Sequence, residues 1–197
     1  MRAITAAVLG LALALGGTAT ASADDTRKVD RGEYAAVHIG DTLAEVAKVF
    51  GARGSEDFKY VDGGVGAQMR TWDVTESDDG FVTLVFERKA GYWVVTDKIA
   101  LWQLTPKQTA DTMTKREYRS ITKGMTLAQV RKIAGTSGTL CMETGGRVLG
   151  KMKGVAWPVY PSSEGGAIMM FEWSKGAYRL TSKEVDWDGT SDLFEGL

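Results

Sequence analysis

Two short segments of the chain place apolar residues every three or four positions, with polar residues between them. This spacing predicts two amphipathic helices over residues 43–50 and 127–134, each burying one apolar stripe. The first stripe is Leu43, Val46, Val49 and Phe50, and the second is Leu127, Val130, Ile133 and Ala134. A shorter apolar turn, 34–37 or 118–121, precedes each of them across a glycine, so we expect two paired helices in each place.

The ends of the two amphipathic helices are marked by capping residues. Thr42 is followed three residues later by Glu45, and Thr126 by Gln129. This is the spacing of a capping box, in which the Thr oxygen and the Glu or Gln side chain each accept from a backbone amide of the first turn. A glycine, suited to a left-handed C-terminal cap, follows each stripe at positions 51 and 135.

Alternating apolar and polar residues predict strands over 67–74, 81–88 and 92–104, separated by turn-forming residues at 77–80 and 89–91. Residues 53–66 are rich in glycine and charge, and we expect them to form a loop. In the same way, we expect a loop over 139–154.

The pattern occurs twice. Residues 33–54 and 117–138 align without a gap at an offset of 84, and ten of the 22 positions are identical. The strand segments align at an offset of 85, with Trp72 opposite Trp157. The sequence therefore predicts an α+β fold of two tandem copies of one module. We assign residues 33–104 to the first copy, 105–116 to a connector and 117–197 to the second copy.

Strand periodicity also predicts which side chains face the helices. Leu84, Phe86, Trp93 and Val95 share one parity, as do their second-copy counterparts Met169, Phe171, Tyr178 and Leu180. The alternate set should form an open face: Phe81, Thr83, Val85, Tyr92, Thr96, Lys98 and Trp102, with Arg179, Thr181, Lys183 and Trp187. This mixture is typical of a protein–protein contact surface. The alternative is that some of the tryptophans close the sheet edges or the joint between the copies.

The first residues have the features of a secretory signal peptide. Arg2 precedes an apolar run over 6–15, and Ala21-Ser22-Ala23 provides a small-residue cleavage site. We therefore predict a signal peptide over 1–23, a flexible leader over 24–32 and a secreted protein. Cleavage of the signal peptide would remove one charged residue, Arg2, and leave 23 basic and 25 acidic residues, a net charge of −2. This balance argues against nucleic acid as a partner and, with no second apolar run, against membrane insertion.

Few residues suit catalysis. Cys141 is the only cysteine and His38 the only histidine, so a nucleophile–base pair or a metal site cannot be repeated in both copies. Cys141 is interpreted as a small buried residue and His38 as a surface residue. A duplicated carboxylate, Glu87 and Glu172, would be too widely separated for an acid pair. We predict a binding protein without enzymatic activity, metal or cofactor.

Three segments resemble the β-lactamase inhibitory protein family. Residues 157–165 read WPVYPSSEG, similar to the family's aromatic-Pro-x-Tyr-Pro-Ser-x-x-Gly run. Residues 124–130 read GMTLAQV, similar to its Gly-Met-Thr-x-x-Gln-Val, and Trp187-Asp188 resembles a Trp-Asp near its C-terminus. The family pattern also includes a disulfide in each copy, for which this chain has only Cys141.

The resemblance implies two helix-loop-helix modules, each with a four-stranded antiparallel sheet, joined into one concave eight-stranded surface. It implies an exported partner enzyme, a class A β-lactamase or a related penicillin-binding enzyme, bound by a monomer. Residues 78–81 are the nearest match to the family's inhibitory hairpin. The expected contact residues are Asp78, Asp79, Phe81, Tyr92, Trp102, Trp157, Tyr160 and Trp187. The alternative is a cell-envelope adaptor or sensor that uses the same fold without inhibiting an enzyme.

Overall fold

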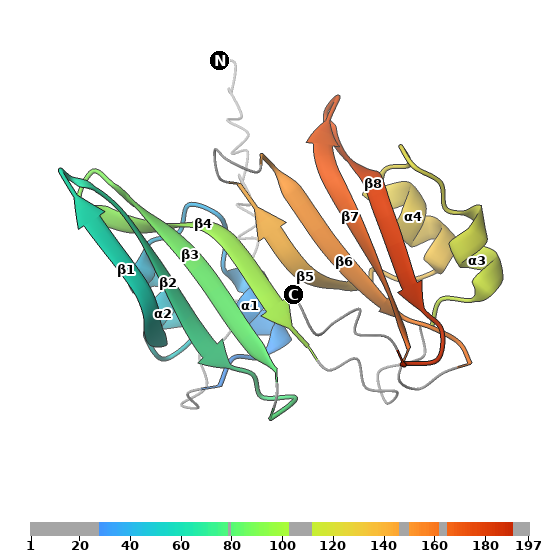
Figure 1. Cartoon of the computed structure of the whole chain (residues 1–197), viewed down its shortest axis with the longest axis horizontal. Helices are drawn as coiled ribbons and strands as arrows, with labels where there is room; N and C mark the ends of the chain where they lie inside the picture. Colours follow the sequence, from blue (N-terminus) through green and yellow to red (C-terminus); the bar gives the residue numbers. More distant parts are fainter. Residues whose placement is uncertain (1–27, 79, 103–111, 146–149, 162–164, 191–197) are drawn as a thin grey trace, which may run out of the picture.

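The computed structural model describes residues 28–78, 80–102, 112–145, 150–161 and 165–190. Two helices followed by four strands occur twice along the chain (Figure 1). The first set is α1 (Arg31–Ala36), α2 (Leu43–Val49), β1 (Ser55–Asp62), β2 (Val65–Asp73), β3 (Phe81–Lys89) and β4 (Tyr92–Leu101). The second set is α3 (Lys115–Ser120), α4 (Leu127–Ala134), β5 (Thr139–Thr144), β6 (Met152–Pro158), β7 (Gly166–Ser174) and β8 (Ala177–Asp186).

All eight strands form one antiparallel sheet in the order β1 to β8, so each strand pairs with its neighbours in sequence. The helices of each set pack on one side of their own four strands (Figure 1). The expected α+β fold with an antiparallel sheet is confirmed. The strand register places Lys98, which contacts α1, and Phe171, which packs under α3 and α4, in one row, so both helix pairs lie on the same side of the sheet. The other side carries no helix from the described part of the chain.

The loops expected over 53–66 and 139–154 were wrong, because these segments contain β1 and β5. All eight residues of β1 are exposed, and glutamate, aspartate and lysine interrupt its apolar positions. An edge strand of this kind is held by its backbone ladder to β2 rather than by burial of its side chains. The hydrophobic pattern therefore contained little indication of a strand.

Each helix begins with a complete capping box. The boxes expected at Thr42 and Thr126 are confirmed, and the shorter helices have boxes of their own at Asp30 and Thr114. Helix α1 begins at Arg31, so the last residues assigned to the flexible leader belong to the folded unit. Likewise, Met113 belongs to the predicted connector, but it is buried and forms a β-bridge with Val159.

Each helix pair covers its own hydrophobic core. The side chains predicted to face the helices are confirmed there: Leu84, Phe86 and Val95 are buried under α1 and α2, and Met169, Phe171 and Leu180 under α3 and α4. Leu140 of β5 packs against both cores. The two cores therefore meet at the start of the second set of strands.

The joint between the two halves of the sheet is narrow. Strands β4 and β5 share three paired positions, Asp97–Thr144, Lys98–Glu143 and Ile99–Met142. A chain of charges crosses this joint: Lys98 Nζ lies 3.7 Å from Glu143 Oε2, and Lys153 Nζ lies 3.1 Å from Glu143 Oε1. Helix α1 adds a contact, since Arg31 Nη1 donates to Thr139 Oγ1 at 2.8 Å.

Candidate functional site: the open face of the sheet

A β-bulge in β4 changes which side chains face the helices. Val85 pairs with Asp97 and Phe86 with Val95, so Thr96 is an extra residue without a partner in the ladder. A bulge places two residues of one strand opposite one of the other, which reverses the alternation beyond it. The prediction that Lys98 lies on the open face was therefore wrong. Its Nζ donates to the carbonyl oxygens of Tyr34 and Val37, at the end of α1, at 3.0 and 2.6 Å.

Strand β8 has the matching bulge. Met170 pairs with Ser182 and Phe171 with Leu180, which leaves Thr181 as the extra residue. Lys183 consequently points toward α3, where its Nζ donates to the carbonyl oxygens of Tyr118 and Ile121. Lys183 was also expected on the open face, and that prediction was wrong for the same reason.

The bulges also remove two expected tryptophans from the open face. Trp102, beyond the first bulge, is buried against Tyr34 of α1, with ring centroids 5.6 Å apart at 78°. Trp187, beyond the second, is half-buried and packs edge-on against Tyr118, with centroids 5.5 Å apart, while Lys115 Nζ lies 5.2 Å from its ring. Both residues stabilise the helices instead of offering a contact surface.

Trp157 is not available to a partner either, because it is fully buried in the second core. Its ring lies so close to Gly138 that a Cβ at that position would overlap it. Trp72 and Gly54 repeat the arrangement in the first half. The tryptophans at these positions are core residues, and the prediction of Trp157 as a contact residue was wrong.

The remaining expected contact residues differ in exposure. Tyr92 is 67% exposed at the start of β4, Tyr160 is exposed after β6, and Phe81 is half-buried at the start of β3. Asp78 is exposed, and its carboxylate lies 3.2 Å from Lys28 Nζ. Asp79 lies outside the described residues. Tyr92 stands at the opposite end of the sheet from the β2–β3 connection that carries Asp78 (Figure 1).

Gly80 has a structural reason to be glycine. A Cβ there would overlap Val74 and lie 2.8 Å from the Leu101 carbonyl oxygen. Its counterpart Gly165 is equally confined, because a Cβ there would lie 2.5 Å from the Asp186 carbonyl oxygen. Position 80 thus belongs to the close packing at the start of a strand, and a larger residue could not occupy it without a shift of its surroundings.

The strand register defines two faces of the sheet. The helix-covered face includes Gln68, Leu84, Lys98 and Val155, which lie on the side packed by the helices. The open face is the other side. One of its rows crosses all eight strands through Ser55, Thr71, Thr83, Ile99, Met142, Gly154, Met170 and Ser182.

Two exposed aromatic residues of the open face were missed in the sequence. Phe58 and Tyr60 on β1 are each 53% exposed, and they pair with Met69 and Ala67 of β2. Tyr60 Oη donates to Asp62 Oδ2 at 3.3 Å, as expected of residues two apart on one face. Their alternating positions in the segment SEDFKYVD indicated a strand with one aromatic face, but the segment had been assigned to a loop.

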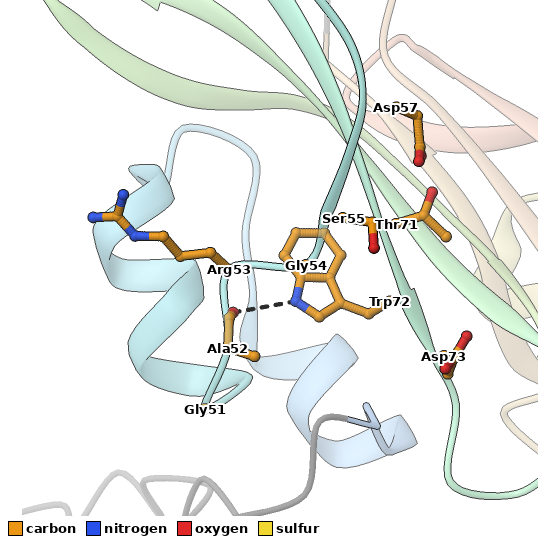
Figure 2. A pocket seen from close by; sticks show the side chains of 9 residues that line it. All are labelled: Gly51, Ala52, Arg53, Gly54, Ser55, Asp57, Thr71, Trp72 and Asp73. Carbon is orange, nitrogen blue, oxygen red and sulfur yellow. Dashed lines mark hydrogen bonds between the residues drawn. The ribbon is translucent and has the colours of Figure 1, made fainter.

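A polar cleft of about 800 Å³ lies where α2 leads into β1 (Figure 2). Residues 51–55 and 71–73, with Asp57, line it, and Trp72 Nε1 donates to the Ala52 carbonyl oxygen at 3.1 Å at its base. In Figure 2 the Arg53 side chain points away from Asp57 and Asp73. The lining of the cleft includes no histidine, cysteine or lysine.

The candidate catalytic groups are not arranged for catalysis. Burial raises the pKa of the Cys141 thiol to about 12, so little reactive thiolate exists at neutral pH. His38 is exposed, with Nδ1 3.8 Å from Asp41 Oδ2. Glu87 and Glu172 stand four strands apart, about 19 Å at the usual strand spacing, which exceeds the separation used by paired carboxylates in glycosidases.

Two absences concern the described residues only. No group of three or more His, Cys, Asp and Glu side chains among them could hold a metal ion. None of the helices described is both long and apolar enough to span a membrane.

Comparison with known families adds the decisive observation. Residues 30–176 match the profile of the β-lactamase inhibitor (BLIP) family. The chain belongs to the BLIP family. The match begins at the cap of α1 and ends in the turn between β7 and β8, so it spans both helix pairs. No curated protein matches the chain.

Membership in the BLIP family bears on two predictions from the sequence. The resemblance read from residues 124–130 and 157–165 is confirmed, since both segments lie within the match. BLIP-family proteins are inhibitors without catalytic activity, which agrees with the interpretation of this chain as a non-enzyme. The match ends before Trp187-Asp188, so it does not test that part of the resemblance.

Proposed function

We propose that this chain is a secreted, non-catalytic inhibitor of class A β-lactamases that binds the enzyme with the open face of its sheet. The observation that carries this proposal is the BLIP-family match over residues 30–176. The geometry supports the choice of face, because each helix pair occupies the opposite side of the strands it covers. Secretion rests on the signal peptide expected over 1–23.

Exposed aromatic side chains of the open face would provide much of the binding energy. Phe58, Tyr60 and Tyr92 are more than half exposed and project from strands β1 and β4. Aromatic side chains in interfaces bury a large area for the few rotatable bonds that they immobilise. We propose these residues as contacts instead of Trp102, Trp157 and Trp187, whose side chains pack against the helices or within the cores.

The β2–β3 connection is a second proposed element of contact. Its carboxylates, Asp78 and Asp79, would enter the active-site cleft, where a carboxylate can replace that of the substrate in a cationic pocket. The Asp78 carboxylate is exposed, and its pairing with Lys28 is a surface ion pair that binding can displace at small cost. Phe81, at the end of this connection, would contact the rim of the cleft.

We further propose that the two halves are tandem copies that together form one concave surface and act as a monomer. Three matched details support duplication: the bulges at Thr96 and Thr181, the lysines beyond them, and the glycines under Trp72 and Trp157. Two parallel bridges, Val29–Val74 and Met113–Val159, also correspond.

The proposal is tested by titrating the purified protein into several class A β-lactamases and following nitrocefin hydrolysis. At least one enzyme should be inhibited at micromolar concentration or below. Asp78→Ala or Asp79→Ala should then weaken inhibition by about 30-fold, or 2 kcal/mol, because the enzyme's cationic groups lose their partner. If no enzyme is slowed while the protein binds a cell-envelope fraction, the adaptor alternative replaces inhibition.

A further inference from the structure

The open face has an apolar centre where the two halves of the sheet join. Ile99, Met142 and Met170 lie in the row that crosses all eight strands, with Gly154 between the two methionines, and Met152 lies two residues before Gly154 on β6. These four residues, called the methionine patch, are half-buried, and Met142 and Met170 pair with Gly154 from its two sides. A Cβ at Gly154 would lie 3.2 Å from Met142 Cβ and 3.2 Å from Met170 Sδ. Glycine there leaves room for the Met170 thioether, which lies over it.

Methionine in this position suits an adaptable contact. Its side chain is unbranched, has three rotatable bonds and carries a polarizable sulfur, so it fits irregular apolar surfaces. Binding surfaces that accept more than one partner use flexible methionine side chains that can repack. The β1 end of the open face differs, because its exposed residues are the stiffer aromatics Phe58 and Tyr60.

Charges are divided between the two faces of the sheet. The strand register places six carboxylates on the open face, Asp62, Asp73, Glu87, Asp97, Glu172 and Glu184, in addition to the buried Asp186. The same face carries two basic residues within the strands, Lys89 and Arg179. On the helix-covered face the order is reversed, with six basic residues, Lys59, Arg70, Arg88, Lys98, Lys153 and Lys183, and two acids, Glu56 and Glu143.

Three of the open-face carboxylates flank the methionine patch. Asp97 lies two residues before Ile99 on β4, Glu172 pairs with Met152, and Glu184 pairs with Ile168 beside Met170. Arg179, opposite Glu172, is the one basic residue near them in the strands. An apolar surface bordered by one sign of charge fits a partner with an apolar projection bordered by the opposite sign.

We propose that the methionine patch and its flanking carboxylates determine which proteins this face binds, and that the partner presents an apolar loop or helix flanked by lysine or arginine. The proposal deepens, and in part rests on, the proposed function: among class A β-lactamases, those with basic residues around an apolar projection bind best. Electrostatic attraction then raises the association rate, and this rate falls when added salt screens the charges.

A designed peptide tests the charge preference without any enzyme. The probe is an amphipathic helical peptide of leucine and lysine, and its counterpart replaces every lysine by glutamate. We expect the lysine peptide to bind in calorimetry and to bind about tenfold more weakly at 300 mM than at 50 mM NaCl. The glutamate peptide should not bind. Equal binding of the two peptides would overturn the proposal.

Matched variants locate the binding. Glu172→Gln removes one exposed charge from the open face, and Glu56→Gln removes one from the helix-covered face, so both give the same net charge. We expect Glu172→Gln to weaken binding of the lysine peptide about threefold, and Glu56→Gln to leave it unchanged. Met152→Gln, which keeps the length of the side chain, should weaken it at every salt concentration. Equal effects of the two charge variants would contradict the proposed face.

The same variants are then measured against any class A β-lactamase that the protein inhibits. Glu172→Gln should slow association at 50 mM NaCl and change dissociation little. If peptide binding follows the expected pattern but no enzyme is inhibited, the proposed function fails and the charge preference stands. If an enzyme is inhibited with association rates insensitive to salt and to Glu172→Gln, inhibition stands and the charge preference fails.

Discussion

Lys98→Met should lower the free energy of unfolding by about 2–4 kcal/mol. The Lys98 side chain is 2% exposed, and its ammonium donates to two backbone carbonyls at the end of α1. Methionine keeps the apolar stem but removes both donors, and an unsatisfied buried carbonyl costs about 1–3 kcal/mol. Glu143 also loses one cation, although Lys153 remains 3.1 Å away. Burial lowers the Lys98 pKa, against the opposing effect of the Glu143 charge, so desolvation offsets part of the loss.

Lys183→Met is the matched control. Lys183 makes the same pair of hydrogen bonds, at 2.5 and 2.7 Å, and lies 4.0 Å from the centre of the Tyr118 ring, as Lys98 lies 4.4 Å from that of Tyr34. It differs because β8 is the edge of the sheet and Lys183 is half-buried. Water can replace the lost donor there, so we expect a loss of about 1 kcal/mol.

Urea unfolding of both variants, followed by circular dichroism and tryptophan fluorescence, measures the difference. We expect Lys98→Met to lower the free energy of unfolding by at least about 1 kcal/mol more than Lys183→Met does. The larger effect is that of Lys98, the residue at the joint between the halves. Glu143→Gln should cost about 1 kcal/mol, because it weakens the charge chain and leaves both carbonyl hydrogen bonds in place. Equal losses for the two lysine variants would contradict the deeper burial of the Lys98 hydrogen bonds.

Three other changes are expected to have measurable results. Thr42→Ala and Thr126→Ala should each lower the unfolding free energy by about 1 kcal/mol in urea titrations, with Thr→Ser restoring most of it; no effect would contradict the capping role. Gly138→Ala should cost more than about 2 kcal/mol because its Cβ overlaps Trp157, whereas Gly135→Ala, left-handed but in open space, should cost about 1. The Cys141 thiol, with its pKa raised to about 12, should react with a thiol reagent at pH 8 at least about a hundredfold more slowly in the native protein than in urea. Equal rates would contradict its burial.

The sequence predicted the parts of the fold that depend on local chemistry. Capping residues and apolar stripes located α2 and α4, since both features act within a single turn. Alternation located β2, β3 and β4 and gave the correct helix-facing residues before the bulges, such as Leu84 and Phe86. Two of the three short runs that carried the BLIP resemblance lie within the family match.

The candidate site was predicted less well because two bulges reverse the alternation. Nothing in the residues around Thr96 or Thr181 marks an extra position, and the Thr96 hydroxyl donates to the Val85 carbonyl oxygen only once the ladder has formed. The side chains beyond a bulge, including Lys98, Trp102 and Trp187, therefore lie on the face opposite to the one predicted. A bulge depends on pairing between strands, which alternation along one strand does not report.

The position of β1 at the edge of the sheet explains why its two exposed aromatic residues were missed. Phe58 and Tyr60 lie in a strand with one neighbour, where polar residues are tolerated on both faces. The charged residues that suit an edge strand also resemble those of a loop. Reading the alternation of two aromatics through the charges would have located both the strand and the exposed pair.

The inhibition constant of two single variants tests the binding face most directly. Tyr92→Ala removes an aromatic side chain that is 67% exposed on the open face, and Trp173→Ala removes one that is 48% exposed on the helix-covered face. Against the class A β-lactamase that the protein inhibits most strongly, Tyr92→Ala should raise the inhibition constant about tenfold or more, and Trp173→Ala should leave it within about twofold. A larger loss from Trp173→Ala than from Tyr92→Ala would contradict binding through the open face.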